Sequence, residues 1–247
     1  MYENTKRGPE YSIVVLCYGS GDLIPKFVEA TIDVLLKNQI LDYQLVLVGN
    51  YLENQTDQTA EIVKELEKGN PRIRSIAKKK DGMMGWDMRT GLAAATGKYI
   101  SVIDGDGQMP VEDLVKVYRK IKNENYDLVK TVRTTREDGV WRAVISCVFN
   151  MLFRLLFPAV KSKDVNSKPK IITRASYESL DLKSDDWFID AEIMIQAGSL
   201  GFKVGELPTY FNAPTRNSGS FITFFTILEF GKNLIRFRFT EFWKKRR

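Results

Sequence analysis

Apolar residues follow two alternating patterns along the first half of the chain. Short runs of aliphatic and β-branched residues predict buried strands, which lie at 11–18, 43–49, 73–77, 98–104 and 126–132. Apolar residues at helical spacing predict helices between these runs, at 23–36, 57–68, 85–96 and after Pro110. Strands that alternate with helices predict an α/β fold with a mostly parallel, doubly wound sheet flanked by helices.

The second half of the chain has a less regular pattern. The sequence predicts an apolar helix at 140–157, a further helix at 190–202, and short strands at 170–174 and 203–211. No internal repeat, low-complexity segment or linker interrupts the sequence.

The C-terminal tail combines apolar and basic side chains. In FITFFTILEFGKNLIRFRFTEFWKKRR (221–247), aromatic and aliphatic residues stand beside Lys232, Arg236 and Arg238. An apolar face with basic flanks is typical of helices that lie on anionic membranes. The alternative is a helix that docks on its own domain. We expect a domain over 1–219 and an amphipathic basic, membrane-facing helix over 220–247.

Composition and charge limit the chemistry that the chain can perform. The 247 residues have a net charge of +6, which favours a phosphorylated substrate or an anionic membrane as partner. The absence of histidine removes the commonest general base and zinc ligand. We do not expect nucleic acid as a partner, because the basic residues do not gather on one recognition element. Cys17 and Cys147 lie in apolar stretches and predict two buried thiols.

Two aspartates end the strand predicted at 98–104, in the stretch YISVIDGDGQMP. Ligands of doubly wound sheets bind beyond the carboxyl ends of the strands, where Asp104 and Asp106 fall. Carboxylate and amide oxygens suit Mg²⁺ or Mn²⁺, and we expect Asp104, Asp106 and Gln108 to hold such a cation against a diphosphate. The alternative is an ordinary turn, in which Asp and Gly are common.

The stretch GMMGWDMRTGLAAATGKYISVIDGDGQMP resembles glycosyltransferase family 2. It is most similar to the branch of dolichyl-phosphate mannose and polyprenyl-phosphate sugar synthases, in which Arg-x-Gly-Leu on a glycine-punctuated helix precedes Asp-x-Asp-x-Gln. The resemblance continues in order through RTTREDGVWR (133–142), DVNSKPKIITR (164–174), FIDAEIM (188–194) and RNSGS (216–220). It implies a Rossmann-like fold of the GT-A type.

The resemblance also implies roles for individual residues. DVNSKPK is similar to the family's Asp-x-x-x-Gly-x-Lys, which matches Asp164 and Lys170. The implied catalytic residues are Asp104, Asp106, Asp190 and Glu192. The implied donor-binding residues are Tyr18, Asp57, Gly85, Arg89, Asp104 and Lys170. The residues implied to bind an acceptor phosphate are Arg133, Arg136, Arg142, Arg216 and Ser220. Guanidinium groups suit phosphate oxygens, although each arginine alone is also consistent with a solvated surface charge.

The N-terminal third departs from the family's pattern. The family opens with a Pro-x-Tyr-Asn-Glu turn, where this chain has CYGSGD (17–22). After its second strand the family has two adjacent aspartates that help to hold the nucleotide base. This chain has VGNYLENQTDQT, in which only Asp57 matches a later acidic position. The nucleobase of the donor therefore stays open.

The resemblance and the missing histidine together predict the reaction. A phosphate acceptor needs no general base, because a phosphate monoester is mostly dianionic near neutral pH, with a second pKa of about 6. We expect an inverting, metal-dependent glycosyltransferase that moves a sugar from a UDP- or GDP-sugar to a polyprenyl phosphate, with Mg²⁺ or Mn²⁺ as cofactor. Two alternatives stay open: transfer to a sugar hydroxyl in polysaccharide or lipid-linked glycan synthesis, and a catalytically weak homologue that serves as a binding protein.

The sequence also gives an expectation for location. The N-terminal MYENTKRGPEYS lacks the apolar core of a signal peptide, and no window reaches the ~18 uninterrupted apolar residues of a spanning helix. We expect a cytoplasmic protein in peripheral contact with the cytoplasmic face of a membrane. Its oligomeric state stays open.

Overall fold

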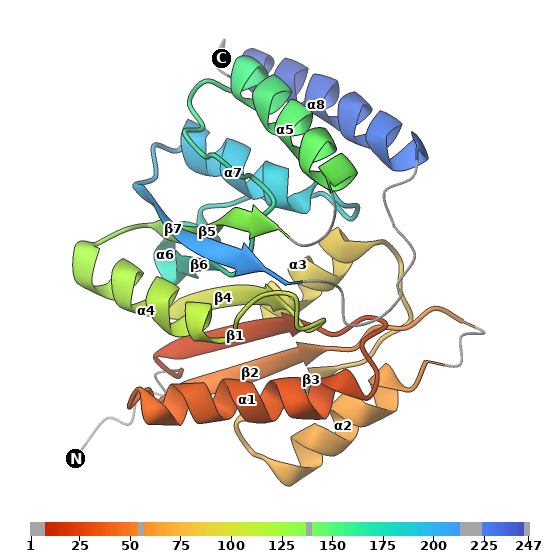
Figure 1. The fold of residues 1–247 in the computed structure, drawn as a ribbon, viewed down its shortest axis with the longest axis vertical. Helices are drawn as coiled ribbons and strands as arrows, with labels where there is room; N and C mark the ends of the chain where they lie inside the picture. Colours follow the sequence, from red (N-terminus) through yellow and green to blue (C-terminus); the bar gives the residue numbers. More distant parts are fainter. Residues whose placement is uncertain (1–7, 54–56, 137–139, 213–223, 245–247) are drawn as a thin grey trace.

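One mixed sheet organises the molecule (Figure 1). The computed structural model describes residues 8–53, 57–136, 140–212 and 224–244. In these residues the sheet has the strand order β3-β2-β1-β4-β6-β5-β7, and β6 runs antiparallel to both of its neighbours. The strands are β1 (Tyr11–Leu16), β2 (Tyr43–Val48), β3 (Ile73–Ile76), β4 (Tyr99–Asp104), β5 (Leu128–Arg136), β6 (Lys170–Thr173) and β7 (Val204–Phe211).

Helices cover both faces of this sheet and form two apolar cores with it. One core joins the sheet to α1, α2 and α4, and the other joins it to α3, α5, α7 and α8. The described helices are α1 (Leu23–Lys37), α2 (Thr59–Gly69), α3 (Met84–Ala94), α4 (Glu112–Glu124), α5 (Val140–Leu156), α6 (Arg174–Glu178), α7 (Ile189–Ser199) and α8 (Phe224–Lys244). The predicted α/β fold with a mostly parallel, helix-flanked sheet is confirmed.

Two features of the second half differ from the sequence-based expectation. The strand expected to end at residue 132 continues to Arg136, because it pairs with β7 along its whole length, with an irregularity between Arg133 and Thr135. Cys147 is exposed on α5, whereas Cys17 is buried as expected. The apolar sequence of α5 does not by itself show which face of the helix packs against the core, because the helix it packs against is distant in sequence.

The register of the central strands brings their carboxyl ends to one edge of the sheet. Leu16 at the end of β1 pairs with Val48 of β2 and with Asp104 of β4. The loops that follow β1, β2 and β4 therefore meet at this edge, at the arrowhead end of the strands in Figure 1. This is the edge at which doubly wound sheets bind ligands.

The C-terminal helix α8 packs beside α5 at the end of the molecule opposite α1 (Figure 1). The rings of Phe149 and Phe230 meet edge-on with centroids 5.2 Å apart. The ring centroids of Phe188 and Phe237 are 5.0 Å apart. Leu234 is buried. One face of α8 is thus docked on the domain. None of the described helices combines the length and the apolar character that crossing a bilayer requires.

Candidate active site

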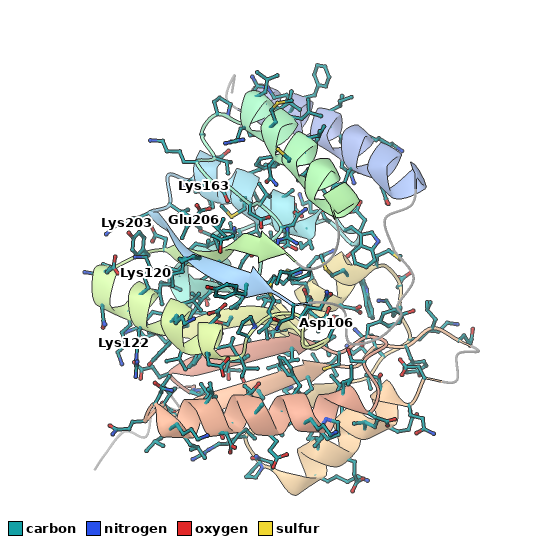
Figure 2. The ribbon with its side chains drawn as sticks, in the orientation of Figure 1. Asp106, Lys120, Lys122, Lys163, Lys203 and Glu206 are labelled. Atoms are coloured by element: carbon teal, nitrogen blue, oxygen red, sulfur yellow. The ribbon has the colours of Figure 1, made fainter. Side chains whose placement is uncertain are left out.

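Asp104 and Asp106 lie where β4 leaves the sheet. The Gly105 N–H donates to the Leu16 carbonyl at 2.9 Å, which holds the start of the turn against β1. Gly107 has a φ of +75°, in the region that glycine adopts most readily, and the Gln108 N–H donates to Asp106 Oδ1 at 3.0 Å. Figure 2 shows Asp106 at this edge, at the end of the sheet opposite Lys120, Lys122 and Lys203.

The two carboxylates have the oxygen donors that Mg²⁺ and Mn²⁺ prefer. Burial and the neighbouring charge of Asp104 raise the pKa of Asp106 to about 6, which marks a place where a cation would relieve repulsion. The Gln108 amide nitrogen donates to the Asn212 carbonyl at 3.2 Å. In the described part of the chain no group of three or more acidic, histidine or cysteine side chains forms a cage for a metal ion. The pair therefore fits a cation that takes its remaining ligands from water and phosphate.

Asp190 lies between two buried lysines beside this pair. Its Oδ2 is 3.1 Å from Lys168 Nζ, and its Oδ1 is 2.5 Å from Lys170 Nζ. Lys168 Nζ also lies 3.2 Å from Asp104 Oδ2, so the predicted residues Asp104, Asp190 and Lys170 belong to one charged cluster. Burial alone would raise the pKa of Asp190, but the two ammonium groups lower it.

Lys168 is a member of this cluster that sequence reasoning missed. Val102 of β4 pairs with Lys170 of β6 in an antiparallel register, which places Lys168 opposite Asp104 beyond the end of the ladder. Burial favours the neutral amine, but the carboxylates of Asp104 and Asp190 raise the pKa of Lys168, so it is positively charged at neutral pH. The signal was present in the sequence: Lys168 stands where the family's Asp-x-x-x-Gly-x-Lys has glycine.

Tyr18 and Asp57, two predicted donor-binding residues, lie on the β1 and β2 side of the edge. Asp57 Oδ2 accepts a hydrogen bond from the Gly19 N–H at 3.2 Å, and its Oδ1 accepts one from Thr59 Oγ1 at 2.7 Å. Asp57 therefore ties the loop after β1 to the start of α2. The Lys80 ammonium lies 3.9 Å from the centre of the Tyr18 ring.

A second buried cluster, also missed from the sequence, adjoins Tyr18. Lys80 forms a buried ion pair with Asp87 of α3, and Asn50 Nδ2 donates to Asp87 Oδ1 at 2.8 Å. Asn50 Oδ1 accepts a hydrogen bond from the Lys78 N–H at 2.9 Å. The loops after β2 and β3 are thus joined to α3 at the place where the family's paired aspartates are missing.

The predicted residues of α3 contact the segment that precedes α7. A Cβ on Gly85 would lie 2.5 Å from the carbonyl oxygens of Ser184 and Asp186, so glycine allows close packing there. Arg89 forms an ion pair with Asp185, in which Arg89 Nη1 lies 2.5 Å from Asp185 Oδ1. Both residues therefore shape the segment around Asp185, and their donor-binding role stays a prediction.

Glu192 is buried on α7 two positions after Asp190, and because 3.6 residues make a turn the two side chains point in different directions and have different partners. Its carboxylate accepts hydrogen bonds from the backbone N–H groups of Lys183 and Ser184, at 3.0 and 2.7 Å, and from Gln196 Nε2 at 3.1 Å. It anchors the segment before α7, whereas Asp190 faces the lysines. The structure thus brings Asp190, but not Glu192, into contact with the Asp104 cluster.

The predicted phosphate-binding arginines are only partly described. Arg133 Nε and Nη2 donate to the Asp164 carboxylate at 2.7 and 2.8 Å. Burial would raise the pKa of Asp164, but the Arg133 hydrogen bonds lower it to about 2. Arg136 ends β5 and Arg142 lies in the first turn of α5, with side chains outside the described part of the structure. Arg216 and Ser220 lie outside the described residues altogether.

The chain is similar in sequence to known sugar transferases. Residues 12–172 match the model of the family described as Glycosyl transferase family 2. Glycosyltransferase AglD of Haloferax volcanii is 26% identical over 210 residues, which cover 83% of this chain and 33% of the relative. Dolichyl-phosphate beta-glucosyltransferase ALG5A of Trichomonas vaginalis is 24% identical over 214 residues, which cover 81% of this chain and 65% of the relative. The chain thus spans from a third to just under two thirds of these relatives.

The fold also has a counterpart among solved structures. Glucosyl-3-phosphoglycerate synthase of Mycobacterium tuberculosis superposes with a TM-score of 0.67 at 19% identity, over 92% of this chain and 78% of that chain. Other structures of that enzyme contain uridine diphosphate with Mn²⁺ or Mg²⁺. The likeness confirms the fold expected for the GT-A type.

Proposed function

Because the chain belongs to glycosyltransferase family 2, we propose that it transfers a sugar from a nucleotide-sugar to a polyprenyl phosphate at a membrane surface. The reaction is an inverting, in-line displacement in which an acceptor phosphate oxygen attacks the anomeric carbon and the nucleoside diphosphate leaves. The relative named as a dolichyl-phosphate glucosyltransferase supports this acceptor class. The cytoplasmic face is the proposed side of the membrane.

The carboxyl edge of β4 supports the donor part of the proposal. Asp104, Asp106 and Gln108 are the residues that would hold Mg²⁺ or Mn²⁺, and the cation would neutralise charge on the leaving diphosphate. The bound Mn²⁺ and uridine diphosphate of the structural neighbour agree with this chemistry. Lys168 and Lys170 keep the Asp190 carboxylate ionised and oriented beside Asp104.

The lysines beside Asp190 bear on whether this carboxylate could activate a sugar hydroxyl as acceptor. A hydroxyl must lose a proton as it attacks, and a general base works best when its pKa lies near the working pH. The two lysines lower the pKa of Asp190, which weakens it as a base. A phosphate monoester is already anionic and requires no base.

An exposed apolar stripe on the neighbouring helices α5 and α8 is the observation that carries the choice of a lipid acceptor. On α5 the stripe consists of Val148, Met151, Leu152 and Leu155, which are 42–77% exposed and recur at helical spacing. On α8 it consists of Ile235 and Phe239, which are 57% and 62% exposed. Exposed Lys232, Arg236 and Arg238 flank the α8 residues. Apolar side chains beside basic ones fit an anionic bilayer surface.

The activity can be tested with vesicles that contain dolichyl or undecaprenyl phosphate, labelled UDP- and GDP-sugars, and Mg²⁺ or Mn²⁺. We expect label in an organic-extractable, acid-labile product. Asp106→Asn should lower the rate at least about 100-fold, because it removes a ligand of the cation that stabilises the leaving group. Asp33→Asn, an exposed change on α1, serves as the matched control with an unchanged rate.

Two other outcomes would redirect the assignment. Label in a water-soluble glycan, with none in the lipid extract, would support a hydroxyl acceptor. If no nucleotide raises the thermal stability of the folded protein and no donor is turned over, the proposed transferase activity is wrong and a binding role remains.

A further inference from the structure

Lys168 places a fixed positive charge beside the two aspartates at the end of β4. Its side chain is 4% exposed, and its ammonium lies 3.2 Å from Asp104 Oδ2 and 3.1 Å from Asp190 Oδ2. Its third neighbour is Met84 Sδ at 3.4 Å. The ammonium therefore lies among two carboxylates and a thioether sulfur, and it donates hydrogen bonds to Asp104 Oδ2 and to the sulfur.

The backbone around Lys168 is held as firmly as its side chain. The Lys168 carbonyl accepts a hydrogen bond from Thr131 Oγ1 at 2.6 Å, and the Thr131 N–H donates to the Pro169 carbonyl at 3.2 Å. These bonds join the residues before β6 to β5. The sheet therefore sets the position of the ammonium relative to Asp104, and the lysine cannot swing away without breaking buried contacts.

This lysine changes the charge that a divalent cation would meet. The cluster contains the carboxylates of Asp104, Asp106 and Asp190 and the ammonium groups of Lys168 and Lys170, which leaves one net negative charge. Without the Lys168 ammonium, the cluster would carry two net negative charges. Lys168 also occupies Asp104 Oδ2, an oxygen that a cation would otherwise use.

We infer that Lys168 makes divalent-cation binding at Asp104 and Asp106 depend on the nucleotide. In the protein alone, the ammonium competes for Asp104 and repels the cation, so Mg²⁺ or Mn²⁺ binds weakly. A nucleoside diphosphate adds negative charge and oxygen ligands, so cation and nucleotide bind together and leave together. Lys168 acts on the cation through Asp104 and is a positioning residue. The inference rests on the proposed function, because it requires a nucleoside diphosphate at this edge.

Manganese titrations followed by the electron paramagnetic resonance signal of free Mn²⁺ test the inference without measuring turnover. Wild type and Lys168→Gln are titrated alone and with saturating UDP or GDP. We expect Lys168→Gln without nucleotide to bind Mn²⁺ roughly tenfold more tightly than wild type, which equals about 1.4 kcal/mol. The factor by which nucleotide increases Mn²⁺ affinity should be correspondingly smaller in the variant. Equal affinities of the two proteins without nucleotide would overturn the inference.

Three further variants separate a positioning role from a structural one. Lys170→Gln removes the other lysine of Asp190 and should change Mn²⁺ affinity less, because Lys170 bonds to Asp190 and the Ser167 carbonyl. In an Asp104→Asn background, Lys168→Gln should lose most of its effect, since the residue through which it acts is neutral. If the Lys168→Gln protein does not fold, Lys168→Gly is used in its place. A purely structural lysine would change the unfolding temperature and leave Mn²⁺ affinity unaltered.

Failure of the inference can be distinguished from failure of the proposed function. If wild type binds Mn²⁺ tightly without nucleotide, the inference is wrong and the transferase proposal stands. If neither protein binds Mn²⁺ or a nucleoside diphosphate, both are wrong.

Discussion

At the scale of single residues, buried ion pairs surround the candidate site. In one of them, Arg133 donates two hydrogen bonds to the Asp164 carboxylate. Asp164 is 6% exposed, so its carboxylate depends on Arg133 for the interactions that water would otherwise supply. The pair joins β5 to the segment that carries Lys168. The Arg133–Asp164 ion pair therefore helps to hold the segment around Lys168 against β5.

The lowered pKa of Asp164 predicts a loss of stability in acid. A carboxyl group that titrates near 2 in the folded protein and near its ordinary 3.8 when unfolded stabilises the fold above pH 4 by about 2 kcal/mol. That contribution decreases as the pH falls toward 2, because the unfolded chain takes up the proton first. We expect the difference in unfolding free energy between wild type and Asp164→Asn, measured with urea, to shrink by about 1 kcal/mol between pH 6 and pH 3.

The exposed Asp181 provides the comparison for this experiment. Asp181 pairs with Lys183 at 2.7 Å, but both side chains are more than 60% exposed. Exposed pairs contribute little to stability, so Asp181→Asn should change the free energy of unfolding by less than about 1 kcal/mol. A difference for Asp164→Asn that stays constant from pH 6 to pH 3 would argue against the lowered pKa.

At the scale of elements, helix α3 is held close to the sheet by a glycine. A Cβ on Gly91 would overlap the side chain of Val14 in β1 and lie 2.8 Å from Val48 Cγ2 in β2. The helix carries Asp87 and follows the loop that holds Lys80, so its distance from the sheet sets the geometry of that buried cluster. Gly231 in α8 is the opposite case, because nothing lies within 4 Å of the added Cβ.

Replacing these two glycines by alanine should therefore have opposite effects on stability. Gly91→Ala is expected to lower the free energy of unfolding by about 1–3 kcal/mol, since the methyl group must displace packed side chains. Gly231→Ala should raise it by up to about 1 kcal/mol, because alanine favours the helix and meets no obstacle. Urea titrations of both variants check the pair. Two changes of the same sign would contradict the packing of either α3 or α8.

At the scale of the whole molecule, the proposed function involves two regions of one chain, the carboxyl edge of the sheet and the exposed stripe of α5 and α8. On α8, Leu234 is buried in the domain, whereas Ile235 and Phe239 are exposed. A lipid acceptor requires that its phosphate reach the sheet edge while its chain stays in the bilayer. The contact of this stripe with a membrane stays a prediction.

Vesicle binding tests the stripe directly. Leu155→Glu should weaken binding to equimolar phosphatidylglycerol–phosphatidylcholine vesicles roughly tenfold or more, because burying one leucine side chain contributes about 1.5–3 kcal/mol. Leu41→Glu changes another exposed leucine, 59% exposed against 77% for Leu155, in the loop between α1 and β2, and this variant should bind like wild type. Binding should also weaken in high salt and on pure phosphatidylcholine. Equal binding of both variants would exclude the stripe as the membrane contact.

The sequence by itself determined the alternation of strands and helices and the position of Asp104 and Asp106 at a strand end. These features depend on apolar periodicity and turn residues, which act between near neighbours in the chain. The sequence alone was also sufficient to identify glycosyltransferase family 2, because the motifs of the family occur in order along the chain.

Only the tertiary structure decided which charged residues meet. Lys168 contacts Asp104 across 64 positions of sequence, since β6 runs antiparallel beside β4 and continues their register beyond the ladder. Asn50, Lys80 and Asp87 likewise converge from two loops and a helix. Such pairings depend on the free energy of the whole packed sheet, so no local pattern around Lys168 specifies that its ammonium lies between Asp104 and Asp190.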